Sequence, residues 1–188
     1  MVYLLLLLWL WDVSGALADS YEMLLDAQNT TVTFSFAALA HTVHGVVPIV
    51  PSKIKIDNRQ QRVHGLVYID TTKISTHNKD RDKKMHREVL ESARFPDIYF
   101  KPILYRGDLQ LGKAGQIELV GELYIHGDSH TIEVPCSVDW QEGQLHLSAN
   151  YTLPYVAWGM KDPSKFIFRV GKEAYLKMKI DAPLIAIP

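Results

Sequence analysis

Apolar and polar residues alternate in short runs along most of this 188-residue chain. A period of two places every second side chain on one face of a β-strand, so each run predicts a strand with one apolar face. Turn-forming stretches such as DNRQQ, LGKAG, HGDSH and QEGQ separate the runs, and no linker or internal repeat divides them. The pattern predicts one all-β domain, an antiparallel barrel or sandwich. The clearest runs are TVTFSF, SKIKID, VHGLVYID, QIELVGELYI, QLHLSANYTL and YLKMKI.

One segment, residues 83–93, has helical spacing instead. Ser75 and Thr76, ahead of it, are residue types that cap helix N-termini. Pro96 cannot continue a helix and predicts its end. We expect a short amphipathic helix, inserted between two strands, that covers an end or flank of the sheet. Its apolar stripe consists of Met85, Val89, Leu90 and Ala93.

The first 18 residues resemble a secretory signal peptide. The apolar run Val2–Trp11 has signal-peptide length, and Ala16–Ala18 supplies a small-x-small cleavage pattern, although no Lys or Arg precedes the run. The run is shorter than the ~20 apolar residues that span a bilayer. We therefore expect export, with a domain over 19–188, and a retained membrane anchor is the alternative.

Composition and motifs disfavour several classes of function. The net charge of −1 gives no reason to expect a nucleic-acid partner. No Gly-x-Ser-x-Gly elbow, phosphate-binding Gly-rich loop or His-Glu-x-x-His motif occurs, so we expect neither an enzyme nor a cofactor. Cys136 is the single cysteine, which excludes an intrachain disulfide. It shares its strand face with apolar residues and is expected to be a small buried hydrophobe.

Eight histidines raise the hypothesis of a metal site. His41 and His44 are close in sequence, and His126 and His130 flank a turn. The spacing of His, Cys, Asp and Glu does not match a structural zinc site, which needs four ligands. We therefore expect exposed or core histidines and no metal, and keep a histidine-based metal binder as the weakest alternative.

A series of motifs spans residues 29–180. A strand with alternating apolar residues precedes a Thr-x-x-x-x-Arg-Asp loop, a helix with a Met, and an aromatic–Pro passage into a strand. A Gly-x-Leu-x-x-x-Gly hairpin follows later. In this order the series resembles the YceI-like lipid/polyisoprenoid-binding family. The residues of this chain that form the motif series are Phe34, Phe36, Gly45, Thr76, Arg81, Asp82, Met85, Phe95, Pro96, Phe100, Gly121, Leu123 and Gly127.

The resemblance implies a lipocalin-like antiparallel barrel of about eight strands, a size that can hold one ligand. It further implies non-enzymatic carriage or storage of a long isoprenoid or quinone-type lipid in an apolar lumen, in an exported bacterial protein, periplasmic or secreted. Whether the domain acts as a monomer or a homodimer stays open. Two segments depart from the family pattern, 41–53 and 154–172, and we expect both near the barrel mouth.

Nine apolar residues are candidates for contact with the lipid. Periodicity alone makes them ordinary core, and the resemblance makes ligand contact an equal alternative. A competing function is a protein-interaction or structural barrel filled by its own side chains, because a lumen and a packed core give the same period-two pattern. The candidates are Phe34, Phe36, Phe95, Phe100, Leu123, Ile125, Trp140, Tyr151 and Leu153.

Two cations are candidates for binding a lipid head group. Arg81, with Lys84 nearby, could donate charge-assisted hydrogen bonds to it. The alternative, which we favour at this point, is a local Arg81–Asp82 pair that fixes the entry into the helix.

The signal-peptide hypothesis predicts cleavage between Ala18 and Asp19. Protein exported by its native host should have Asp19 as its first residue, measured by N-terminal sequencing and intact mass. Recovery of the full-length chain from the membrane fraction would contradict the cleavage and favour the anchor.

Overall fold

The computed structural model of the protein describes residues 20–39, 41–165 and 169–187. The expected signal peptide, 1–18, and its cleavage point lie outside these residues. No helix within the described ranges is long and apolar enough to cross a membrane. The described strands are β1 (Ser20–Leu25), β2 (Thr30–Ala38), β3 (His41–Val46), β4 (Ser52–Asp57), β5 (Arg62–Gly65), β6 (Val67–Asp70), β7 (Asp97–Gly107), β8 (Gly115–Ile125), β9 (Asp128–Gln141), β10 (Gln144–Leu153), β11 (Ala174–Pro183) and β12 (Ile185–Ile187).

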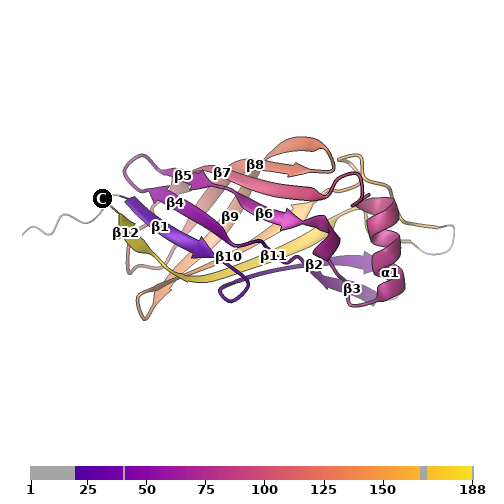
Figure 1. Ribbon diagram of the computed structural model, residues 1–188. Coiled ribbons are helices and arrows are strands. Elements are labelled where there is room, and N and C mark those ends of the chain that lie inside the picture. Colours follow the sequence, from indigo (N-terminus) through magenta and orange to yellow (C-terminus); the bar gives the residue numbers. More distant parts are fainter. Residues whose placement is uncertain (1–19, 40, 166–168, 188) are drawn as a thin grey trace, which may run out of the picture.

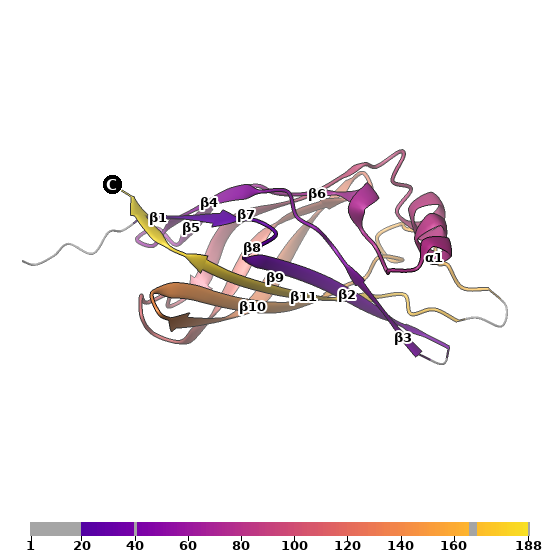
Figure 2. The ribbon, with the colours of Figure 1, turned by 60° about the horizontal axis from the view of Figure 1, so that its bottom comes forward.

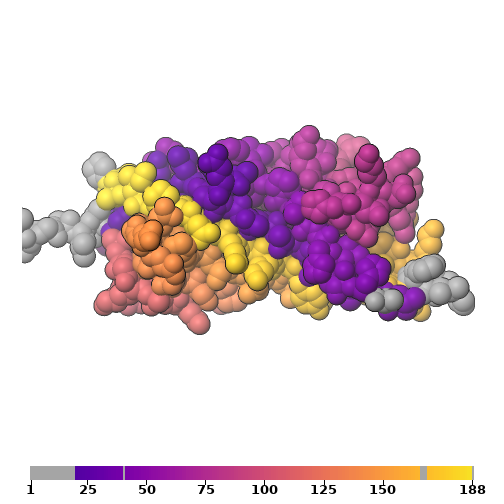
Figure 3. Space-filling model, turned by 90° about the horizontal axis from the view of Figure 1, so that it is seen from below, coloured from indigo at the N-terminus to yellow at the C-terminus, as the bar shows by residue number. Residues whose placement is uncertain are grey.

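All these strands belong to one antiparallel sheet, in the order β12-β1-β4-β5-β7-β8-β9-β10-β11-β2-β3, and β6 pairs with β7. The sheet curls into an elongated barrel-like body (Figure 1). One residue, Leu184, separates β11 from β12, and β12 pairs with β1. β11 pairs with β10 and β2, so β11 and β12 together link the two ends of the strand order of the sheet. Figure 3 shows these C-terminal strands between β10 and the N-terminal strands. Two isolated antiparallel β-bridges, outside the named strand pairs, connect Val46 with Ser75 and Val50 with Tyr68.

The strand count of about eight was too low, since the described residues form a twelve-stranded sheet. The run VHGLVYID is divided into β5 and β6 at Gly65, whose φ of 137° lies in the region that favours glycine. The C-terminal run is followed by the separate β12, beyond Pro183. Proline has no N–H to continue a ladder of hydrogen bonds.

The alternation predicted from the sequence is confirmed. In β9, every second residue from Ile132 to Val138 is buried, and the residues between them are exposed. In β4, Ile54 and Ile56 are buried while the neighbouring lysines are exposed. One face of the sheet is thus turned inward in these strands, and its buried residues belong to the core.

Two predicted turns have backbone geometry that suits tight hairpins. His126 and Gly127, between β8 and β9, both have positive φ angles, 54° and 91°. Glu142 and Gly143, between β9 and β10, also have positive φ angles, 52° and 80°. Two consecutive positive φ angles are typical of type I′ turns, whose twist matches that of the flanking strands. These turns place β8, β9 and β10 side by side (Figure 1).

The helix begins earlier than predicted. A short 3₁₀ turn, η1 (Thr71–Lys73), precedes α1 (Lys79–Lys84), which continues directly into a π-helical turn, η2 (Met85–Val89). The N-cap is Asn78, whose side-chain oxygen accepts a hydrogen bond from the Arg81 N–H. Ser75 and Thr76 are not the cap, because their side chains bind Asp82 instead.

The helix also ends earlier than predicted, well before Pro96. Glu91 has a left-handed φ of 46°, which stops helical geometry. Ser92 then donates its backbone N–H to the carbonyl of His86, and its hydroxyl lies 2.9 Å from the His86 ring. Ala93 is consequently exposed and does not belong to the buried stripe.

The rest of the apolar stripe packs as expected. Met85, Val89 and Leu90 are partly buried against the core of the barrel. The helix lies at one end of the molecule, away from β12 and the described C-terminus (Figure 2). It therefore covers one end of the sheet.

The packing of Met85 predicts that Met85→Asp destabilises the domain. An unpaired charge placed against the core should lower the free energy of unfolding by about 2–4 kcal/mol. The measurement is chemical denaturation, with Lys83→Asp as the control, because Lys83 is exposed on the same helix. Equal stability of the two variants would show that Met85 faces solvent.

Candidate functional site

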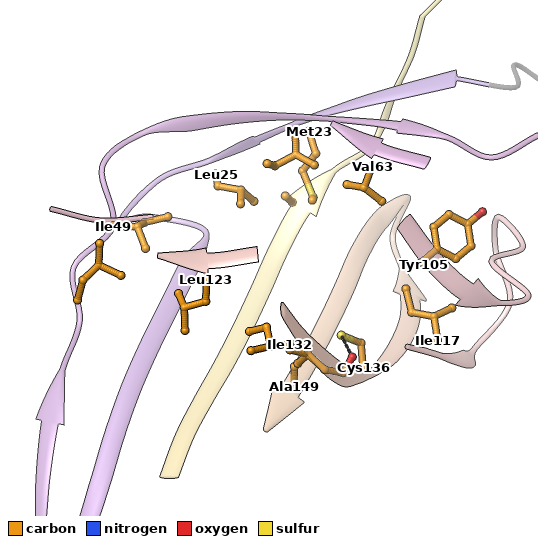
Figure 4. Close-up of a cluster of buried hydrophobic side chains, with 14 of the residues drawn as sticks. Met23, Leu25, Ile49, Val63, Tyr105, Ile117, Leu123, Ile132, Cys136 and Ala149 are labelled. Atoms are coloured by element: carbon orange, nitrogen blue, oxygen red, sulfur yellow. Dashed lines mark hydrogen bonds between the residues drawn. The ribbon is translucent and has the colours of Figure 1, made fainter. Parts of the chain in front are cut away.

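The interior of the barrel contains an apolar cavity of about 510 Å³. Side chains from opposite parts of the sheet point toward it: Met23 and Val63 lie on one side, Ile132 and Ala149 on the other (Figure 4). The side chains of the sheet therefore do not fill the interior from end to end. This space is the candidate site.

Seven of the nine predicted residues line this cavity. Each lies on the inward face of its strand, in β2, β7, β8 or β10, because the period of two brings them to one side. These are Phe34, Phe36, Phe100, Leu123, Ile125, Tyr151 and Leu153.

The other two predicted residues lie elsewhere. Phe95 precedes β7 in a loop, where its ring lies 4.3 Å from the His126 ring and beneath the Arg94 guanidinium at 4.8 Å. It packs on the β8–β9 turn instead of the cavity. Trp140 lies next to the end of β9, where it is partly buried against the core but outside the cavity wall.

Three phenylalanines of the family motif each cover a glycine. A Cβ atom placed on Gly45 would come within 2.3 Å of the Phe34 ring. A Cβ atom on Gly121 would lie within 2.6 Å of the Phe100 ring, and a Cβ atom on Gly127 would lie within 2.8 Å of the Phe95 ring. Only glycine leaves room for these rings, which explains physically why the motif combines the two residue types. Two of the pairs, at Phe34 and Phe100, shape the cavity wall.

Part of the wall was missed by the sequence analysis. Met23 and Leu25 come from β1, whose alternation in YEMLL was a detectable signal. Tyr155, Met160 and Pro163 come from the segment after β10, which has no regular period. Irregular segments carry no periodic signal, so only the tertiary structure reveals such contacts.

The same irregular segment is attached to the helix. Lys84 donates a hydrogen bond from Nζ to the Pro163 carbonyl at 3.1 Å. Lys161 pairs with Glu88 at 3.2 Å. Hydrogen bonds from Arg87 and Lys161 lower the pKa of Glu88 to about 2. Part of 154–172 therefore lies at the helix end of the barrel.

Arg81 and Asp82 do not form the direct pair expected from the sequence. Arg81 instead donates from Nε to the Thr76 hydroxyl at 2.7 Å and from Nη2 to the Thr76 carbonyl at 2.9 Å. Asp82 accepts from the Thr76 N–H and hydroxyl and from the Ser75 hydroxyl. Burial opposes ionisation of Asp82, but these hydrogen bonds outweigh it and lower its pKa. Thr76 thus fixes the entry into the helix.

Both head-group candidates, Arg81 and Lys84, line the cavity at this end. Within the described residues, no Asp or Glu lines the wall, and His41 is its one histidine. The cavity is therefore apolar along the strands and cationic only beside the helix.

The histidines do not assemble a metal site in the part of the chain that the structure describes, where no group of three or more His, Cys, Asp or Glu could hold an ion. His126 binds Glu91 at 2.9 Å, and His130 stacks on Trp158 with ring centroids 3.8 Å apart. Both histidines therefore make contacts within the fold.

Cys136 is buried in β9 and lines the cavity. Burial raises the pKa of its thiol to about 11. The neutral thiol therefore serves as a small apolar wall residue, and a nucleophilic role at neutral pH is disfavoured.

The fold and cavity define a class of protein: an antiparallel barrel with a hollow, apolar interior capped by a short helix. A model of the YceI-like domain family matches residues 24–182, and the chain therefore belongs to this family. Comparison with curated protein sequences yields no match.

Solved structures share the fold at low sequence identity. BcnA from Burkholderia cenocepacia aligns with a TM-score of 0.65 and 14% identity, over 84% of this chain and 96% of that one. A polyisoprenoid-binding domain from Saccharophagus degradans aligns with a TM-score of 0.65 and 11% identity, over 86% and 97%. A Campylobacter jejuni YceI protein aligns with a TM-score of 0.56 and 17% identity, over 72% of this chain and 79% of that one.

The contact between Phe34 and Gly45 predicts the effect of Gly45→Ala. The added methyl group would overlap the Phe34 ring and lie 2.7 Å from the Ser75 carbonyl oxygen. We expect a loss of about 1–3 kcal/mol in the free energy of unfolding, the usual cost of overpacking. Gly171→Ala is the control, since its nearest neighbours lie at 3.5 Å. Equal stabilities in thermal and chemical denaturation would contradict the packing argument.

Proposed function

We propose that this protein binds and carries, or stores, one long apolar lipid of the isoprenoid or quinone type in the barrel cavity, without catalysing a reaction. The observation that carries the proposal is the 510 Å³ cavity with its apolar wall. The ligand-contact residues proposed are the seven predicted positions that line it.

The physical chemistry of the cavity supports this function. Ligand pockets commonly have volumes of about 300–1,000 Å³ and predominantly apolar linings. An apolar chain in such a space gains roughly 25 cal/mol per Å² of buried surface, before ordering costs. Many wall residues share this energy, so no single one is expected to be indispensable.

The comparisons support the same ligand class. The chain belongs to the YceI-like family, and one structural neighbour is described as a polyisoprenoid-binding domain. The identity with that neighbour is only 11%, so the particular lipid does not transfer from it. The compartment is proposed from two observations: residues 1–18 resemble a signal peptide, and the family resemblance implies an exported bacterial protein, periplasmic or secreted.

The competing function, an interaction barrel filled by its own side chains, is disfavoured by the cavity. A packed interior leaves few voids larger than a water molecule, whereas here the free volume is about 510 Å³. The histidine-based metal binder finds no support among the described residues.

The proposal predicts that the protein retains about one lipid per barrel. Protein purified from its native host, or mixed with a long isoprenoid, should release this lipid on organic extraction, detected by mass spectrometry. An empty extract from the native host together with no uptake of added isoprenoid would contradict the carrier function.

Leu123→Gln should weaken lipid binding roughly tenfold, because its amide would be buried in the cavity without a hydrogen-bond partner. The matched control is Leu24→Gln, since Leu24 is 54% exposed on β1. Binding titrations with geranylgeraniol measure both variants, and circular dichroism verifies their folding. Equal affinities would mean that the lipid does not contact Leu123.

A further inference from the structure

The charges on the cavity wall are of one sign and at one end. Arg81 and Lys84 are the lysine and arginine residues of the wall, and the described part of the chain places no carboxylate on it. Both belong to α1, at the end of the barrel that the helix covers (Figure 2). A lipid in the cavity would therefore meet apolar side chains along the strands and cations beside the helix.

The two cations bind only neutral acceptors within the described residues. Lys84 uses one of its three ammonium donors, on the Pro163 carbonyl. Arg81 uses Nε and Nη2 on Thr76, which leaves Nη1. No ion pair at either cation is found in this part of the chain. Both therefore keep donors for a ligand.

The positive charge of Lys84 is less compensated by neighbouring protein groups than that of Arg81. Asp82 binds the same Thr76 hydroxyl as Arg81, so its carboxylate offsets part of the guanidinium charge. Lys84 has no comparable neighbour within ion-pair distance among the described residues. A cation beside an apolar, low-dielectric space is costly unless an anion or a set of hydrogen bonds compensates it.

From this arrangement we infer that the lipid has an anionic end group, a carboxylate or a phosphate, which Lys84 binds directly and Arg81 assists. The inference rests on the proposed function and specifies its ligand class. An ionised acceptor adds Coulomb attraction to these two cations, which a neutral hydroxyl or carbonyl does not supply. The apolar chain would then extend from the helix into the barrel, and Lys84 would fix its direction.

The test compares three lipids with the same C20 chain: geranylgeranoic acid, geranylgeranyl phosphate and geranylgeraniol. Isothermal titration of the purified protein at neutral pH should give about tenfold tighter binding for at least one anion than for the alcohol. The anion with the larger gain identifies the end group. The preference should persist in moderate salt, because partly buried pairs are screened less than exposed ones.

Two variants of adjacent lysines locate the effect. Lys84→Met keeps an unbranched apolar stem and removes the charge, so it should reduce the affinity for the anions toward that for the alcohol. Lys84→Arg should restore most of the preference. Lys83→Met is the matched control, because Lys83 is exposed on the same helix and does not line the cavity. It should keep the full preference.

The outcomes separate this inference from the function on which it rests. Equal affinities for the alcohol and both anions would overturn the anionic end group and leave the carrier function intact. A preference lost equally in Lys83→Met and Lys84→Met would assign it to general surface charge and would also overturn the inference. Failure of all three lipids to bind would instead contradict the proposed function.

Discussion

The structure depends on burying one apolar face of a single antiparallel sheet. Most of the long strands alternate, so one side of the sheet must leave water. No second sheet or layer of helices is available among the described residues to cover it. The sheet therefore curls and covers itself. β11 and β12 make this possible, because consecutive segments of the chain pair with β10 and β2 on one side and with β1 on the other. The same curling encloses the cavity.

At two contacts in the cavity wall, a large aromatic ring lies over a glycine. Phe34 and Phe100 lie over Gly45 and Gly121, so their rings settle against the backbone of neighbouring strands. Rings held in this way leave free volume at the centre of the barrel. The wall can thus be well packed around a space of about 510 Å³.

The helix gives the two ends of this space different chemistry. Thr76, Asp82 and Arg81 fix its entry through a compact set of hydrogen bonds. The link from Lys84 to the Pro163 carbonyl then holds the irregular segment after β10 against it. The short inserted element is therefore both a cover for the barrel and the source of its only cationic wall, within the described residues. An asymmetric cavity of this kind can orient a ligand with one polar end.

The sequence by itself determined the all-β class, the inward face of the strands and membership of the family. Seven of nine predicted cavity residues follow from these, because a period of two depends only on the local backbone. The tertiary structure decided the rest. Alternation cannot distinguish a hollow barrel from a filled one, and it cannot place residues outside the periodic strands, such as Phe95 or Pro163. The tertiary structure also decided where the helix begins. The side chains of Ser75 and Thr76 donate hydrogen bonds to Asp82, and Asn78 caps the helix instead. Contacts between residues distant in sequence arise only when the sheet closes, and no local pattern encodes them.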